Sequence, residues 1–102
     1  MDEIIRGTTP TIKFTYSEIS VSDISIAILT LSQSGTIVIE KNLSEATVGS
    51  DYISWKLSQA ETLSLSKKDV TVICDWVLAN GTRGRSNVLV ANIGEPGKNE
   101  VL

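Results

Sequence analysis

The fold of this chain is decided by residues 70–85, which read VTVICDWVLANGTRGR. Side chains alternate along this run with the period of two that defines a β-strand. Asn80-Gly81 then follows, the strongest short-range signal for a two-residue β-hairpin, because a type I′ turn needs positive φ at both central positions. Such a hairpin pairs Leu78 with Arg83 and Trp76 with Arg85, which would place a guanidinium on the indole face. The stretch predicts a strand over Val70–Ala79, a tight turn, and a return strand over Ser86–Ile93.

Elsewhere in the chain, short runs rich in Ile, Val and Thr recur between Gly, Asn, Asp and Ser, a pattern typical of strands joined by turns. Ser34-Gly35 indicates a second two-residue hairpin. Pro10 suits the start of an edge strand, because proline cannot donate a hydrogen bond to a neighbouring strand. Ser58 and Glu61 form a capping-box pattern, which predicts one helical turn over Gln59–Leu63. The further predicted strands cover Ile4–Ile5, Thr11–Tyr16, Ile24–Leu31, Thr36–Lys41 and Tyr52–Leu57.

The sequences of two of these predicted strands indicate which side chains face the core. Tyr52–Leu57 alternates, which points Ile53, Trp55 and Leu57 inward and Ser54 and Lys56 outward, with Trp55 as a core anchor. Ile24–Leu31 is apolar at almost every position, so that both of its faces are apolar. We expect either that both faces are covered or that one meets a partner. Its two faces are Ile24, Ile26 and Ile28 on one side and Ala27, Leu29 and Leu31 on the other.

Six to seven mainly antiparallel strands with one short helical turn predict an all-β, immunoglobulin-like β-sandwich. A small open barrel is the rival architecture. The 102 residues are enough for one hydrophobic core. We therefore expect a single sandwich domain over residues 1–94 and a C-terminal tail over residues 95–102.

The charge balance bears on the class of partner. The net charge of −3 gives no cationic footprint, so neither nucleic acid nor a membrane surface is expected as a partner. Arg83 and Arg85 are the nearest approach to a basic patch. The first residues lack the apolar core of a signal peptide, which predicts synthesis in the cytoplasm.

The residues that usually carry catalysis are scarce. The chain has no histidine and one cysteine, which removes the usual general base, the Ser-His and Cys-His pairs, and a zinc site. Cys74 lies in an apolar run and is predicted to be a small buried residue. Asp75 interrupts the same run, and we expect Arg83 or Arg85 to lie near it. No enzyme activity, cofactor, metal or small-molecule substrate is predicted.

Three segments carry a resemblance: residues 6–14 (RGTTPTIKF), residues 57–63 (LSQAETL) and the strand-turn-strand around Asn80-Gly81. Together they resemble small tailed-phage and prophage proteins, and their layout is similar to the N-terminal domain of phage baseplate upper proteins. The resemblance implies a virion component that other virion proteins or copies of itself hold in place. Baseplate upper proteins continue into a receptor-binding region, whereas this sequence ends at Leu102, so a head-decoration or adaptor role is expected as readily as a tail role.

Candidate interaction residues follow from the chain ends, from the two-sided apolar strand and from the arginine pair. They are Ile4, Ile5, Leu29, Leu31, Arg83, Arg85, Val101 and Leu102. The alternative is a carbohydrate-binding or cell-surface-binding module of the same fold, with Trp55 or Trp76 as the stacking platform.

Overall fold

The computed structural model describes residues 3–94, which fold into nine strands, one short α-helix and two 3-10 turns. The predicted tail lies outside these residues. The helix α1 (Gln59–Leu63) has the predicted bounds and capping box. The strands are β1 (Glu3–Ile5), β2 (Thr11–Thr15), β3 (Ile24–Gln33), β4 (Thr36–Asn42), β5 (Thr47–Val48), β6 (Tyr52–Lys56), β7 (Val70–Leu78), β8 (Arg83–Arg85) and β9 (Leu89–Gly94), and the 3-10 turns are η1 (Val21–Asp23) and η2 (Leu43–Glu45).

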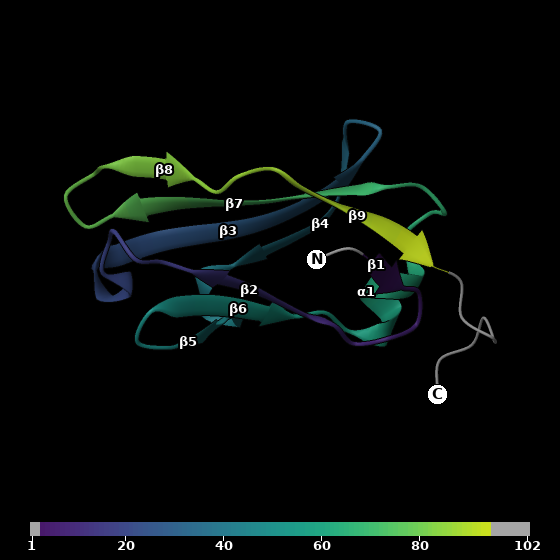
Figure 1. Ribbon diagram of the computed structural model, residues 1–102, viewed down its shortest axis with the longest axis horizontal. Helices are drawn as coiled ribbons and strands as arrows, with labels where there is room; N and C mark the ends of the chain where they lie inside the picture. Colours follow the sequence, from purple (N-terminus) through teal and green to yellow (C-terminus); the bar gives the residue numbers. More distant parts are fainter. Residues whose placement is uncertain (1–2, 95–102) are drawn as a thin grey trace.

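The strands form two stacked sheets, which confirms the all-β sandwich. The larger sheet has the order β1-β9-β7-β3-β4, with β8 also paired to β7, and the smaller has the order β2-β6-β5. Figure 1 shows β7, β3 and β9 above β2, β6 and β5. Among residues 3–94 no strand pair joins the two sheets, so the rival barrel is excluded. Pairing is antiparallel throughout this range except between β1 and β9. As expected from Pro10, β2 is an edge strand.

The core lies between the sheets, and Trp55 is its largest fully buried side chain. Its ring meets Phe14 edge-on at 6.2 Å, and its Nε1 donates to the carbonyl of Asn42 at 2.9 Å. This bond links the smaller sheet to the end of β4. Trp55 is therefore the core anchor that the alternation of β6 predicts. Ser54 points away from the core but is also buried, because β2 and β5 flank it on both sides.

The predicted register of the β7–β8 hairpin is wrong by one residue. The amide of Gly81 donates to the carbonyl of Leu78 at 2.9 Å, and the amide of Leu78 donates to the carbonyl of Thr82 at 2.8 Å, so three residues rather than two form the loop. Gly81 alone in this loop has a positive φ, of 88°. Trp76 consequently pairs with Gly84, and Arg85 pairs with Asp75. The predicted contact between Arg85 and the indole is therefore not formed.

The return strand is divided where Ser86 leaves the ladder. The Ser86 amide donates to the carbonyl of Cys74 at 2.8 Å, and its Oγ accepts from the amide of Cys74 at 2.9 Å. A side chain thus replaces one backbone partner, and the chain resumes pairing with β7 only at Leu89. This division, together with the short β5, raises the strand number from the expected six to seven to nine.

The predicted faces of β3 are correct except at one end. Ala27, Leu29 and Leu31 are fully buried. Ile24 is also buried, whereas Ile26 is 50% exposed, because the register with β7 shifts between these two residues. A bulge therefore turns Ile24 into the core and leaves Ile26 outside. The prediction that Ile24 shares a face with Ile26 is wrong.

Two of the three sequence segments that carry the resemblance, residues 6–14 and 57–63, lie against each other. The Thr62 Oγ1 accepts from the amide of Gly7 at 3.0 Å and donates to the carbonyl of Thr8 at 2.8 Å, and the amide of Leu57 donates to the carbonyl of Pro10 at 2.9 Å. Thr62 is fully buried. These residues therefore hold α1 against the chain that enters β2, which is a structural task.

Candidate interaction surface

The outer face of the larger sheet carries apolar side chains on its two central strands. Two residues that pair across β3 and β7 point to the same face of the sheet. The pairs whose side chains point away from the core include Ile26 with Val77 and Thr30 with Ile73. Ile28 lies between them on β3. We call Ile26, Ile28, Ile73 and Val77 the outer patch.

The outer patch has no covering layer among residues 3–94. Ile26 is 50% exposed and the other three members are half-buried. The smaller sheet covers only the opposite face, where Leu29 is fully buried. In antiparallel sandwiches the solvent face usually carries polar side chains, so a cluster of branched apolar residues there is informative. Ile37 and Val90, 57% and 56% exposed, extend the apolar character of the same face.

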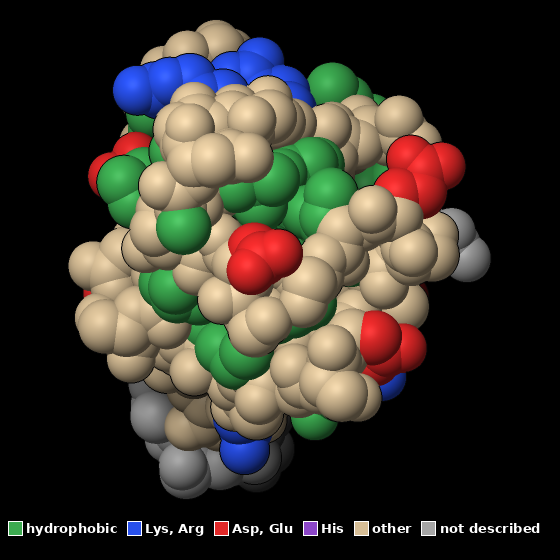
Figure 2. Space-filling model, turned by 90° about the vertical axis from the view of Figure 1, so that its left-hand side faces the viewer, with side chains coloured by type: hydrophobic (Ala, Val, Ile, Leu, Met, Phe, Trp, Pro, Cys, Tyr) green, Lys and Arg blue, Asp and Glu red, His purple; other side chains and the backbone are tan. Residues whose placement is uncertain are grey.

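The β8 edge of this face is cationic. Arg83 pairs across from Val77, and Arg85 from Asp75. The Arg85 Nε lies 2.6 Å from the Asp75 Oδ1, and this hydrogen bond raises the pKa of the guanidinium. The expectation that an arginine accompanies Asp75 is confirmed. Figure 2 looks onto the end of the sandwich that carries the β7–β8 turn, and it shows Lys and Arg side chains at the top of that end above a group of hydrophobic side chains.

A shallow hollow of about 630 Å³ lies where the outer patch meets the arginine edge. Three members of the patch line it together with the Asp75–Arg85 pair and Arg83. Its walls come from β3, β7 and β8, so the regular pairing of three strands fixes their positions. An apolar floor beside fixed charges is the arrangement found at protein interfaces, where an apolar centre has a polar rim.

The opposite edge of the same face is anionic. Glu40 of β4 pairs with Thr30 and is exposed, and Asn42 pairs with Ile28. Among residues 3–94 no ion pair is formed by Glu40 or by Arg83. The outer patch is therefore flanked by positive charge on β8 and negative charge on β4.

Several of the residues predicted for interaction belong to the core instead. Ile4, Leu29 and Leu31 are 1%, 0% and 0% exposed, because all three belong to the hydrophobic core and β3 turns its other face outward. These three predictions are wrong. Ile5 is half-buried on β1, and Val101 and Leu102 lie outside the described residues.

Arg83 and Arg85 are brought beside the outer patch, whose four members were not among the predicted residues. The signal for them was present in the two-sided strand and in the alternation of Ile73 and Val77. Because both faces of the strand are apolar, its sequence does not say which one faces the core.

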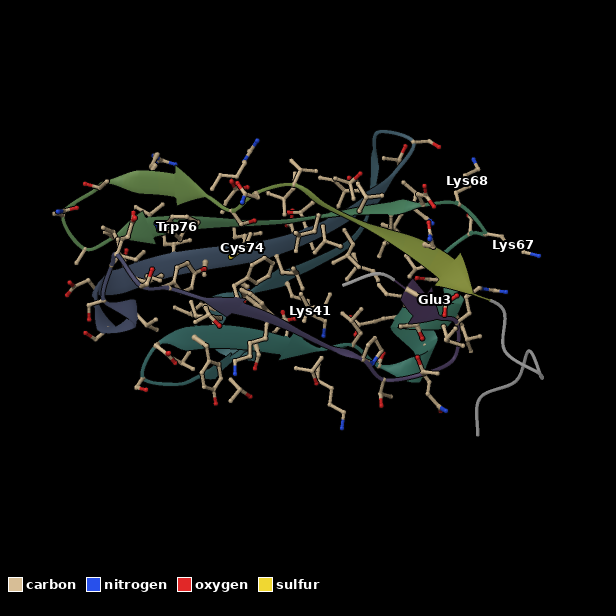
Figure 3. The ribbon with its side chains drawn as sticks, viewed as in Figure 1. Glu3, Lys41, Lys67, Lys68, Cys74 and Trp76 are labelled. Atoms are coloured by element: carbon tan, nitrogen blue, oxygen red, sulfur yellow. The ribbon has the colours of Figure 1, made fainter. Side chains whose placement is uncertain are left out.

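Of the two tryptophans named in the alternative hypothesis, only Trp55 is too deeply buried to form a stacking platform. Trp55 is fully buried. Trp76 is half-buried, meets Tyr16 edge-on at 5.4 Å, and has its indole against Gly84, where a Cβ would lie 2.4 Å from two ring carbons. In Figure 3 Trp76 and Cys74 lie along the same strand, β7. A carbohydrate platform on Trp55 is therefore excluded, and Trp76 is held by protein contacts on two sides.

Cys74 is fully buried, as predicted. Its Sγ lies 3.4 Å from the hydroxyl of Tyr16. Burial raises the pKa of the Cys74 thiol, and it also raises the pKa of Tyr16, so both groups are held in the protonated form. A neutral, inaccessible thiol is a packing residue.

Residues 3–94 lack two further kinds of functional feature, a metal-binding cluster and a membrane-spanning helix. No group of three or more acidic, histidine or cysteine side chains is placed to hold a metal ion within that range. No helix in the same part of the chain has the length and apolar character needed to cross a membrane. Comparisons with protein-family models, with curated proteins and with solved structures find no match for the chain.

Proposed function

We propose that this chain is a non-enzymatic structural component of a phage particle, in the tail, the baseplate or the head surface, and that it works by binding other proteins through the outer patch. The observation that carries the proposal is the uncovered apolar centre of the larger sheet, bordered by Arg83 and Arg85 on one side and Glu40 on the other. The likeness of residues 6–14 and 57–63 to small phage proteins supports the particle as the setting.

The physical basis of binding is the removal of the outer patch from water. Burial of an isoleucine side chain stabilises by about 1.5–3 kcal/mol, so covering the exposed half of Ile26 contributes roughly 1 kcal/mol. Four such residues on adjacent strands form the apolar centre of an interface. The charged edges select among partners, because a partner with the wrong charge leaves them unpaired.

The test is incorporation into particles. The phage or prophage that encodes the chain is propagated, its particles are purified, and the chain is quantified by mass spectrometry. We expect it at a fixed stoichiometry to the other structural proteins. Ile26→Lys should reduce incorporation by about tenfold, because a lysine on the apolar centre has to be desolvated when the partner binds.

The chain provides a matched control. Val48 on β5 is 53% exposed, close to the 50% of Ile26, but it belongs to the smaller sheet. Val48→Lys should therefore leave incorporation unchanged, with both variants checked for native folding by thermal unfolding. Absence of the chain from purified particles, or equal loss in both variants, would contradict the proposal.

A further inference from the structure

The outer face of the larger sheet is self-complementary in charge. Resting on the proposed function of the outer patch as a contact surface, we propose that its partner is a second copy of this chain. The two larger sheets pack face to face about a twofold axis that runs parallel to their strands. Interfaces between identical chains are commonly of this isologous type, in which each patch meets its own copy.

The direction of the axis follows from the charged edges. Across the face the strands run from β8, with Arg83 and Arg85, through β7 and β3 to β4, with Glu40. Rotation about an axis parallel to the strands turns the second sheet over and exchanges its edges, so that Glu40 of the second copy lies above the arginines of the first. An in-plane axis at right angles to the strands would place arginine above arginine, which is repulsive.

The register brings the opposite charges within reach. Glu40 lies in the row of Thr30 and Ile73, and Arg85 in the row of Asp75 and Ile28, two residues further along the strands. Two residues amount to about 7 Å, and packed sheets lie about 10 Å apart. The long side chains of arginine and glutamate span this separation. Because the relation is symmetric, each dimer contains two such contacts.

The same rotation brings apolar residues together in the middle of the interface. It places β3 of one copy above β7 of the other, so that Ile26 meets Val77 in two equivalent places. The footprint of four strands about 4.8 Å apart, over eight paired positions of about 3.3 Å, is roughly 20 by 25 Å. This is a projected area of about 500 Å², against the ~800 Å² of accessible surface that each partner of a standard interface buries, so a weak dimer is expected.

The experiment is sedimentation velocity and light scattering of the chain from low micromolar to millimolar concentration, compared with four variants. We expect the 11.0 kDa chain to form a dimer as the concentration rises. Glu40→Arg and Arg85→Glu should each raise the dimer dissociation constant by about tenfold. Arg85 also pairs with Asp75 within its own chain, and R85E breaks that pair. The double variant E40R/R85E should therefore be compared with R85E alone, and it should bind about tenfold more tightly, because it restores opposite charges in both symmetric contacts. Ile26→Lys should abolish the dimer.

Controls separate a specific pair from a change in net charge. Glu18 and Lys56 are exposed and belong to no strand of the larger sheet, so E18R and K56E repeat the charge changes of E40R and R85E and should leave the dimer intact. Thermal unfolding of every variant confirms that it is folded. A monomer at all concentrations, or a dimer that is insensitive to I26K and to the charge swap, overturns the second copy as partner. Particle incorporation lost in I26K but not in V48K would, in that case, still support the proposed function with a different partner.

Discussion

At the scale of single residues, Gly84 illustrates how a missing side chain fixes a neighbour. A Cβ at this position would lie 2.4 Å from two ring carbons of Trp76, and the ring of Tyr16 meets the indole edge-on at 5.4 Å. We expect Gly84→Ala to destabilise the fold by about 1–3 kcal/mol, the usual cost of overpacking. Denaturant unfolding followed by tryptophan fluorescence measures it, with Arg83→Ala in the same strand as the control. Equal stability of the two variants would show that Trp76 is free to move.

Burial of Cys74 predicts how the free energy of unfolding changes with pH. Its folded pKa is raised by burial, so the folded state holds the proton more tightly than the unfolded state does, and the resulting stability is complete below the unfolded pKa of about 8.5. That stability is lost as the pH rises above this value toward the folded pKa. Cys74→Ala should therefore flatten the fall in unfolding free energy between about pH 8 and pH 9.5, before Tyr16 begins to contribute. An identical slope in the variant would contradict the buried, protonated thiol, as would rapid reaction of the native chain with a thiol reagent.

At the scale of elements, the contact between α1 and the chain before β2 depends on one hydroxyl. The Thr62 Oγ1 accepts from Gly7 and donates to Thr8 in a fully buried position. Thr62→Val keeps the shape but leaves the half-buried amide of Gly7 without its acceptor, which costs about 1–3 kcal/mol. Thr15→Val, at an exposed position on β2, should change the unfolding free energy by less than about 0.5 kcal/mol. A Thr62→Val variant as stable as the original chain would show that this hydroxyl does not hold α1 against the chain before β2.

The sequence predicts the helices, strands and turns better than it predicts the register between strands or which face of a strand is buried. The capping box defines α1 to the residue, and Ser34-Gly35 forms the expected turn with positive φ at both positions. These signals are local, because the residues involved contact one another. The bulge between Ile24 and Ile26 depends on pairing with the distant strand β7, and the sequence pattern therefore missed it. The β7–β8 register was missed for a different reason, because Asn80-Gly81 lies in a three-residue loop in which Gly81 alone has a positive φ. The same reason explains the candidate surface: Leu29 and Ile28 are equally apolar, and only the position of the smaller sheet decides which is buried.

At the scale of the whole molecule, the chain is a slab of 46 × 27 × 19 Å, and among residues 3–94 the smaller sheet covers one face of the larger sheet while nothing covers the other. On the covered side, an ion pair also joins β4 to α1. Lys41 of β4, labelled in Figure 3, reaches Glu61 of α1 at 3.0 Å. Partial burial alone would raise the pKa of Glu61, but the hydrogen bond from the Ser58 amide and the Lys41 ammonium lower it overall. The chain's own smaller sheet thus covers the inner face of the larger sheet. The outer face is the one that we propose for association.

The most direct test of that claim is a methyl spectrum of isoleucine-labelled chain recorded from low micromolar to millimolar concentration. The isoleucines fall into two groups: Ile26, Ile28 and Ile73 lie on the outer patch, whereas Ile12 and Ile53 are 1% and 0% exposed in the core. A second copy packed on the outer patch should shift the methyl signals of the first group as the concentration rises and leave those of the second unchanged. Signals that stay constant in both groups, or shifts confined to residues of the smaller sheet, would contradict the account.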